Sequence, residues 1–421
     1  MADLNIQMPA APIPSPVLPI MDEPSILPIR SCWPHHDEDE IAAVVDVLRN
    51  GRVNSLVHGE RGRAFEQAFA DYVGMPHAIS LANGTLALEL ALRALGVGPD
   101  DEVIVPARSF FATVSCVLAV GATPVFADID AESQGICPAS VERMVSARTK
   151  AVICVHLAGH PCDMDRLVPL CQTHGLWLIE DCAQAHGAAW RGQKIGSFGH
   201  AAAFSFCTDK IMSIGGEGGM LLLADYDHWT RAWAYKDHGK NPDKLRTAGT
   251  PGAFRYVHDS FGSNWRMTEM QAAIGLAQLA KLPRWLTART RNANILRQDL
   301  AGHPLIRLPE FPDHIDHAWY KFYFQLNVDA MAPGRKAMDL IAALQAAGIP
   351  CGSGSCPDMS REAAFAAAPP RKDGALSSAN GLGERSVMLP VDHLLDEADM
   401  HAMAQAVVQL ATSFMQQEGH A

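Results

Sequence analysis

Short apolar runs alternate with helix-like stretches through the middle of this chain, and that alternation limits the fold more than any other feature. Continuous apolar strands that alternate with helices form a mostly parallel sheet, covered by helices on both faces. We therefore expect an α/β fold. The expected strands lie at 78–81, 102–105, 124–127, 150–155, 176–179 and 201–205, and the expected helices at 36–50, 62–73, 85–95, 112–120 and 164–174.

The length of the chain favours two domains, because 421 residues exceed the usual size of one. A long helix from residue 267 is expected to stop before Pro283, since proline cannot donate a helical hydrogen bond. We therefore predict a large domain over 29–282 and a smaller α+β domain over 283–421. The smaller domain should contain a strand at 320–326 and helices to about 300, at 337–347 and from 397.

Composition excludes several classes of partner. The net charge of −12 argues against binding to nucleic acid or to an anionic membrane. No apolar run reaches membrane-spanning length, and the first residues lack the basic start of a secretory signal. The ten scattered cysteines indicate free thiols in a reducing compartment, so a cytoplasmic enzyme is expected. Residues 1–28 carry seven prolines and should form a flexible segment.

Two polar residues follow apolar runs in a way that suggests a cofactor. Lys210 comes shortly after the small-residue run 201–205 and just before the glycine-rich segment 215–219, and Asp181 ends the run that begins at 177. A lysine can form a Schiff base with an aldehyde, and a carboxylate can hold a pyridine nitrogen protonated. Pyridoxal 5'-phosphate (PLP) requires both groups. The alternatives are a surface lysine and a carboxylate that caps the next helix.

Other residues near expected strand ends could complete such a site, because ligands of parallel sheets sit off the carboxyl ends of the strands. Gly84 and Thr85 open a helix, where backbone N–H groups bind phosphate, although a plain helix cap explains them equally well. Ser205 could donate to the same phosphate. Phe110 could stack on a planar ring or belong to the core. Gln184 lies one turn after Asp181 and could reach the phenolic oxygen of the cofactor.

Two other kinds of site are rejected. The segment 215–219 lacks the spacing of a P-loop, and no dinucleotide-binding glycine pattern opens the first helix. The group formed by His156, His160, Cys162 and Asp163 matches no common zinc pattern, so no metal site is expected.

Taken in order, the motifs resemble the DegT/DnrJ/EryC1/StrS family of PLP-dependent sugar aminotransferases, from about residue 29 to about residue 408. Single motifs are modestly specific, but their order and spacing are highly specific. The matching stretches are 82–88, 101–106, 109–113, 155–160, 179–187, 203–206 with Lys210 and 216–219, and 262–275.

The resemblance implies the aspartate-aminotransferase-like fold (fold type I), with a seven-stranded sheet in the large domain, and a homodimer with shared active sites. It places the Schiff base on Lys210, the pyridine nitrogen on Asp181 and the stacked ring on Phe110. It also implies that Gln184 contacts the phenolic oxygen, that Gly84, Thr85 and Ser205 hold the phosphate, and that Asn264 reaches the phosphate in the neighbouring subunit.

The resemblance also implies a reaction. Some members carry histidine in place of the lysine and dehydrate sugars, so Lys210 favours transfer of an amino group from L-glutamate to a keto group of a nucleotide-linked sugar. A keto-cyclitol aminotransferase, a sugar dehydratase and, more distantly, a non-catalytic PLP-binding regulator stay open as alternatives. The stretch 239–262 is longer than in short members and is expected to form a lid or a subunit-crossing loop. His156 and His317 are candidate substrate contacts.

Overall fold

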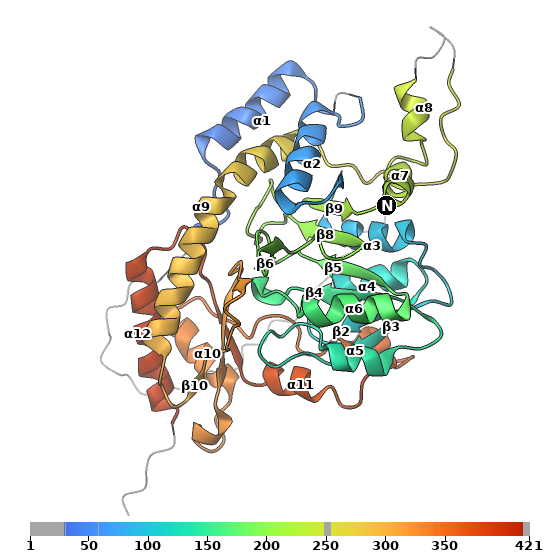
Figure 1. Cartoon of the computed structure of the whole chain (residues 1–421). Coiled ribbons are helices and arrows are strands. Elements are labelled where there is room, and N and C mark those ends of the chain that lie inside the picture. The colour runs from blue at the N-terminus through green and yellow to red at the C-terminus, as the bar shows by residue number, and fades with distance from the viewer. Residues whose placement is uncertain (1–28, 30, 58, 248–253, 416–421) are drawn as a thin grey trace, which may run out of the picture.

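A seven-stranded sheet forms the centre of the computed structural model, which describes residues 29, 31–57, 59–247 and 254–415. The strand order is β1-β9-β8-β5-β4-β2-β3 (Figure 1). Strand β9 runs antiparallel to both of its neighbours, and every other neighbouring pair is parallel. The strands are β1 (His77–Leu81), β2 (Glu102–Pro106), β3 (Thr123–Ala127), β4 (Thr149–Val155), β5 (Trp177–Asp181), β8 (Ala201–Ser205) and β9 (Gly219–Leu223).

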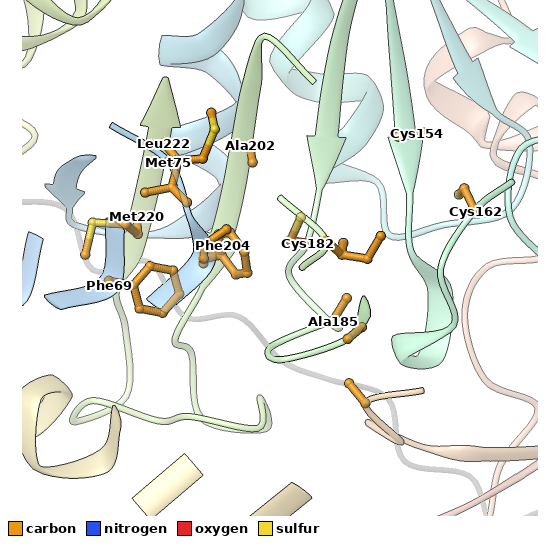
Figure 2. Packing of buried hydrophobic residues seen from close by; sticks show 14 of the residues in the cluster. Phe69, Met75, Cys154, Cys162, Cys182, Ala185, Ala202, Phe204, Met220 and Leu222 are labelled. Carbon is orange, nitrogen blue, oxygen red and sulfur yellow. The ribbon is translucent and has the colours of Figure 1, made fainter. Parts of the chain in front are cut away.

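Alternate residues of each strand pack into different cores, because successive side chains of a strand point to opposite faces. Leu178 belongs to one apolar cluster and Ile179 to another. Figure 2 shows the first cluster, in which Phe69 packs beside Phe204 of β8. Helices α2 (Glu60–Val73), α5 (Pro138–Met144) and α6 (Met164–His174) cover this face, and α3 (Gly84–Ala94), α4 (Ala112–Ala119) and α7 (Tyr226–Lys236) cover the other. The α/β class is confirmed.

Helix α9 (Glu269–Leu300) corrects one expectation, because it continues through Pro283 without a break. A proline inside a helix costs roughly 3 kcal/mol. Burial on both sides of the proline outweighs that cost: Leu282 and Trp285 belong to the first cluster, while Leu296 and Leu300 belong to a third, C-terminal cluster. The helix packs against α1 (Glu38–Asn50) and α2 at its start and against α12 (Glu397–Ser413) further on (Figure 1).

The C-terminal part builds its own apolar cluster on a small antiparallel sheet of order β10-β12-β13. Helix α9 links this part to the large sheet, and the division at residue 283 stays a prediction. The elements are β10 (Ile306–Arg307), β12 (Phe322–Leu326), β13 (Ser386–Leu389), α10 (Ala337–Ala346) and α11 (Ser377–Gly383). A third small sheet joins β11 (Ile315–Asp316), β6 (Ala189–Trp190) and β7 (Gln193–Lys194), and α8 (Pro242–Arg246) follows α7.

Two expectations fall wholly or partly outside the described residues. The proline-rich segment 1–28 is one, and the stretch 239–262 is the other, since 248–253 are not described. In the part of the chain that is described, no helix is both long and apolar enough to cross a membrane.

Candidate active site

A cavity of about 1020 Å³ opens beyond the carboxyl ends of β5 and β8, where the predicted residues meet. Its other wall comes from the C-terminal part of the chain, including Tyr320, Tyr323 and the segment 352–356. The cavity brings together seven of the eight predicted site residues, namely Gly84, Thr85, Phe110, Asp181, Gln184, Ser205 and Lys210.

Lys210 points into this cavity and is held by its neighbours. Its carbonyl oxygen accepts a hydrogen bond of 2.8 Å from Nε1 of Trp33. Its Nζ lies 3.4 Å from the hydroxyl of Tyr320 and 3.5 Å from Oδ1 of Asp209. The same Tyr320 hydroxyl donates a short hydrogen bond to Oδ2 of Asp209. The amine is therefore oriented by a tyrosine and a carboxylate, while its side chain stays 14% exposed to the cavity.

Asp181 is a buried carboxylate with two neutral donors. Its Oδ1 accepts from the backbone N–H of Ala183 at 3.1 Å, and its Oδ2 accepts from the hydroxyl of Thr113 at 3.2 Å. Thr113 is oriented in turn by the hydroxyl of Ser109 at 3.0 Å. Burial raises the pKa of Asp181, although both hydrogen bonds and the charge of Lys210 act in the opposite direction. A cationic ring nitrogen beside this carboxylate would offset the cost of burial.

The start of helix α3 forms an anion cradle against β8. The Asn83 side chain caps the helix by accepting from the N–H of Leu86 at 3.0 Å, and the first-turn N–H groups have no helical partner. A Cβ atom at Gly84 would lie 2.7 Å from Cβ of Ser205. Glycine is therefore required for this close approach, which places the hydroxyl of Ser205 beside the N–H groups. A phosphate suits this arrangement.

Gln184 and Phe110 have the features expected for contacts to a planar ring. Oε1 of Gln184 accepts from the N–H of Ala158 at 2.6 Å, so its amide NH₂ is the group left to donate. Ala158 adopts a left-handed conformation, with φ of 59°, which aims its N–H at this oxygen. Phe110 is 70% exposed at the cavity, whereas Phe111 packs against the core. An exposed aromatic ring at a cavity is free to stack on a ligand.

Three other candidates do not line the cavity as the described residues form it. Asn264 is exposed, on a segment bridged to Asp237. His156 is fully buried and its two ring nitrogens contact Oε2 of Glu180 and the N–H of Cys162. His317 stacks on Trp319 with ring centres 3.8 Å apart. Neither histidine lines the cavity as the described residues form it, and their role as substrate contacts stays a prediction.

Sequence reasoning missed the residues that reach the cavity from elsewhere. Asp209 directly precedes Lys210 but was not assigned a role. Tyr320, Lys321 and Tyr323 were assigned only to a strand. The alternation of polar and apolar residues from 320 to 324 was the available signal, because in a strand it puts Lys321 and Tyr323 on the same face.

The residues of the cavity fit PLP on three independent points. Lys210 offers an amine for the aldehyde, Asp181 offers a buried carboxylate for the pyridine nitrogen, and the cradle at Gly84 and Ser205 offers donors for the phosphate. This fold and this site together define a PLP-dependent enzyme.

Comparison with known proteins narrows this class to a family. Residues 34–408 match the DegT/DnrJ/EryC1/StrS aminotransferase family, and the chain belongs to it. It is 42% identical over 291 residues to a UDP-N-acetyl-3-dehydro-alpha-D-glucosamine 3-aminotransferase of Acidithiobacillus ferrooxidans, covering 69% of this chain and 75% of that one. It is 42% identical over 276 residues to an L-glutamine:2-deoxy-scyllo-inosose aminotransferase of Streptomyces fradiae, covering 63% of each.

The fold is also similar to that of a solved structure. The aminotransferase from Psychrobacter cryohalolentis superimposes with a TM-score of 0.88 at 40% identity, over 91% of this chain and 99% of that one. The protein is thus a PLP-dependent sugar aminotransferase, which confirms the expected fold, family, enzyme class and cofactor. The roles of individual residues stay predictions.

Proposed function

We propose that the protein transfers an amino group from L-glutamate to a keto group of a nucleotide-linked sugar. One observation carries the proposal: Nζ of Lys210 shares a cavity with the buried carboxylate of Asp181 and the anion cradle at Gly84. The nucleotide-linked sugar is supported by the name of the Acidithiobacillus relative. A cavity of about 1020 Å³ has room for such a ligand.

Each residue of the site has a task in this reaction. When bound, PLP supplies an aldehyde that accepts an amine and a ring that withdraws electrons from the reacting carbon. Lys210 holds the aldehyde end and, through Nζ, takes a proton from the reacting carbon and returns it. Asp181 holds a proton on the ring nitrogen. Tyr320 and Asp209 orient Nζ of Lys210, which lies 3.4 Å from the Tyr320 hydroxyl and 3.5 Å from Oδ1 of Asp209.

The test of the role of Lys210 is covalent. Borohydride treatment of the PLP-loaded protein should add a phosphopyridoxyl mass to the peptide that contains Lys210. Lys210→Ala should lose turnover by at least about a thousandfold, as expected when a residue that is both anchor and proton carrier is removed. Lys150→Ala, an exposed lysine on β4, should behave as wild type. Full turnover in Lys210→Ala would refute the role.

A keto-cyclitol is the second candidate substrate, because the Streptomyces fradiae relative is named for one. Protein whose cofactor has taken up the amino group from the donor should be incubated with keto-sugar nucleotides and with keto-cyclitols in parallel. Before that, incubation with glutamate must change the cofactor absorbance and release 2-oxoglutarate. Absence of that half-reaction with every amino donor would favour a dehydratase or a non-catalytic regulator instead.

We further propose a homodimer with shared active sites in the cytoplasm. The exposed Asn264 lies outside its own cavity, and Phe254, Tyr256 and Phe261 are 79%, 87% and 97% exposed. Such an aromatic surface favours a partner subunit. The ten cysteines are all free, which supports a reducing compartment. Sedimentation should give a dimer, and mixing Lys210→Ala with Asn264→Ala subunits should restore activity to one site in each mixed dimer.

A further inference from the structure

Arg108 is a buried cation without a carboxylate partner among the described residues. Its side chain is 1% exposed, and Nε and Nη1 make no hydrogen bond there. Nη2 donates one long bond of 3.4 Å to the carbonyl oxygen of Ser353, and the guanidinium lies 5.9 Å from the ring centre of Tyr323. A buried charge without a partner is unfavourable, so its presence calls for a compensating anion.

Arg108 lies against residues of the cavity wall. Tyr323 and Ser353, the two residues that Arg108 approaches, both line the cavity, and so does Ser109, its neighbour in the chain. Burial lowers the pKa of Arg108, and the acidic groups that oppose this effect are the phenol of Tyr323 and the thiol of Cys356. Neither is a carboxylate. Inside a protein, where the dielectric constant is low, a charge placed behind such a wall acts strongly on an anion in front of it.

Lys321 brings a second unpaired cation to the same wall. It lines the cavity and has no carboxylate within ion-pair distance in the described part of the chain, although Asp209 and Asp392 oppose the lowering of its pKa by burial. Its Nζ lies 5.1 Å from the ring centre of Tyr320. Lys321 and Tyr323 face the cavity, while Phe322 between them packs into the C-terminal cluster. Lys210 has Asp209 at 3.5 Å from its amine, and the same carboxylate acts on Lys321 only from beyond ion-pair distance.

This cationic wall is separate from the residues that fit the phosphate. The cradle is built by Gly84 and Ser205 at the start of α3 and the end of β8, whereas Lys321 belongs to the segment that leads into β12. A second anion bound in the cavity would therefore lie beside cations that the phosphate cradle does not use.

We propose that Lys321 and Arg108 form a subsite for a carboxylate of the substrate, with Lys321 in contact and Arg108 acting through the wall of Tyr323 and Ser353. The inference rests on the proposed function, in which donor and acceptor enter this cavity in turn. The carboxylate can come from the amino donor or from an acidic sugar ring. The planar guanidinium and the ammonium suit a carboxylate in either case.

The experiment separates the two sources. In the first half-reaction of the PLP-loaded protein, Lys321→Met should bind glutamate about ten- to a hundredfold more weakly, as expected for loss of a charged contact, and Arg108→Met should lose a smaller factor because Arg108 acts through the wall. The non-reacting dicarboxylate maleate, measured by calorimetry, should lose the same factor. Lys321→Arg should recover most of it, and Lys150→Met should equal wild type. If only carboxylate-bearing keto sugars are affected, the sugar is the source.

A stability measurement distinguishes a ligand-binding arginine from a structural one. Arg108→Met should melt at the same temperature as wild type or higher, because an uncompensated charge is removed. Arg289→Met should melt lower, since Arg289 donates to the carbonyl oxygens of Trp319 and Tyr320 at 3.1 and 3.4 Å. Unchanged binding of glutamate, maleate and acidic sugars in Lys321→Met would overturn the subsite. Failure of wild type with every amino donor would instead refute the proposed function, and maleate binding would still test the subsite.

Discussion

Glu180→Gln should destabilise the protein through a small and well-defined change. Glu180 is fully buried on β5, one residue before Asp181. Its Oε1 accepts from the N–H groups of Phe198 and Gly199 at 2.8 and 2.7 Å. Its Oε2 accepts from the N–H of Gly196 at 2.8 Å and faces Nε2 of His156 at 3.3 Å. The carboxylate thus anchors the loop that leads into β8.

The size of the stability loss in Glu180→Gln follows from the tautomer of His156. Its Nδ1 accepts from the N–H of Cys162 at 3.0 Å, so Nε2 carries the proton and donates to Glu180. In Glu180→Gln the amide oxygen can keep the bonds to Phe198 and Gly199. The amide NH₂ then faces two donors, which lose their acceptor at about 1–3 kcal/mol each. The total, about 2–6 kcal/mol, is a large part of the 5–15 kcal/mol that is typical of protein stability.

Differential scanning calorimetry of the PLP-loaded protein can measure this loss. With an unfolding entropy of about 2.1 cal/mol/K per residue, a 421-residue chain should melt about 2–7 °C lower. Glu142→Gln, an exposed glutamate on α5, serves as the control and should not shift. Activity per folded molecule should stay near wild type, because Glu180 does not line the cavity that the described residues form. An unchanged melting temperature would refute the hydrogen-bond account.

Three further results are expected at the cavity. Gly84→Ala should weaken PLP binding at least about tenfold in a fluorescence titration, because its Cβ would lie 2.7 Å from Cβ of Ser205. Burial raises the pKa of Asp181 above its ordinary value of 3.8, so PLP affinity should rise with pH as this carboxylate ionises. The carboxyl's contribution to the stability of the apoprotein should be lost as the pH rises over the same range. Asp181→Asn should flatten both pH profiles. Tyr320→Phe should slow the glutamate half-reaction about tenfold and shift its pH profile, because the Tyr320 hydroxyl orients Nζ of Lys210. Stopped-flow absorbance measures this rate, and glutamate binding should stay near wild type.

The parallel strands could be predicted from the chain, and most of the candidate site with them. Asp181 and Ser205 end apolar runs, and parallel strands bring their carboxyl ends to one edge. Strand β9 was missed, because its residues follow a glycine-rich segment that was assigned to a loop. The continuity of α9 through Pro283 was missed because it depends on packing against distant segments.

The remaining site residues depend on contacts across long stretches of chain. Tyr320 reaches Lys210 across 110 residues, and Arg108 reaches Ser353 across 245. No local pattern encodes such a pairing. Hydrophobic periodicity indicates which face of a strand is buried, but it does not indicate which other segment covers that face. The wall that we assign to substrate selection is therefore the part that needed the structure.

The two-residue period of a strand explains how the same short segments supply both the core and the site. On β5 the neighbours Glu180 and Asp181 point to opposite faces, so one carboxylate can stabilise the loop before β8 while the other is left for the cofactor. The segment leading into β12 repeats this division, with Phe322 in the core and Lys321 in the cavity. A substitution on the core face should therefore change stability at nearly constant chemistry, and a substitution on the cavity face should act mainly on the chemistry. The pair Glu180→Gln and Asp181→Asn tests this separation within two consecutive residues.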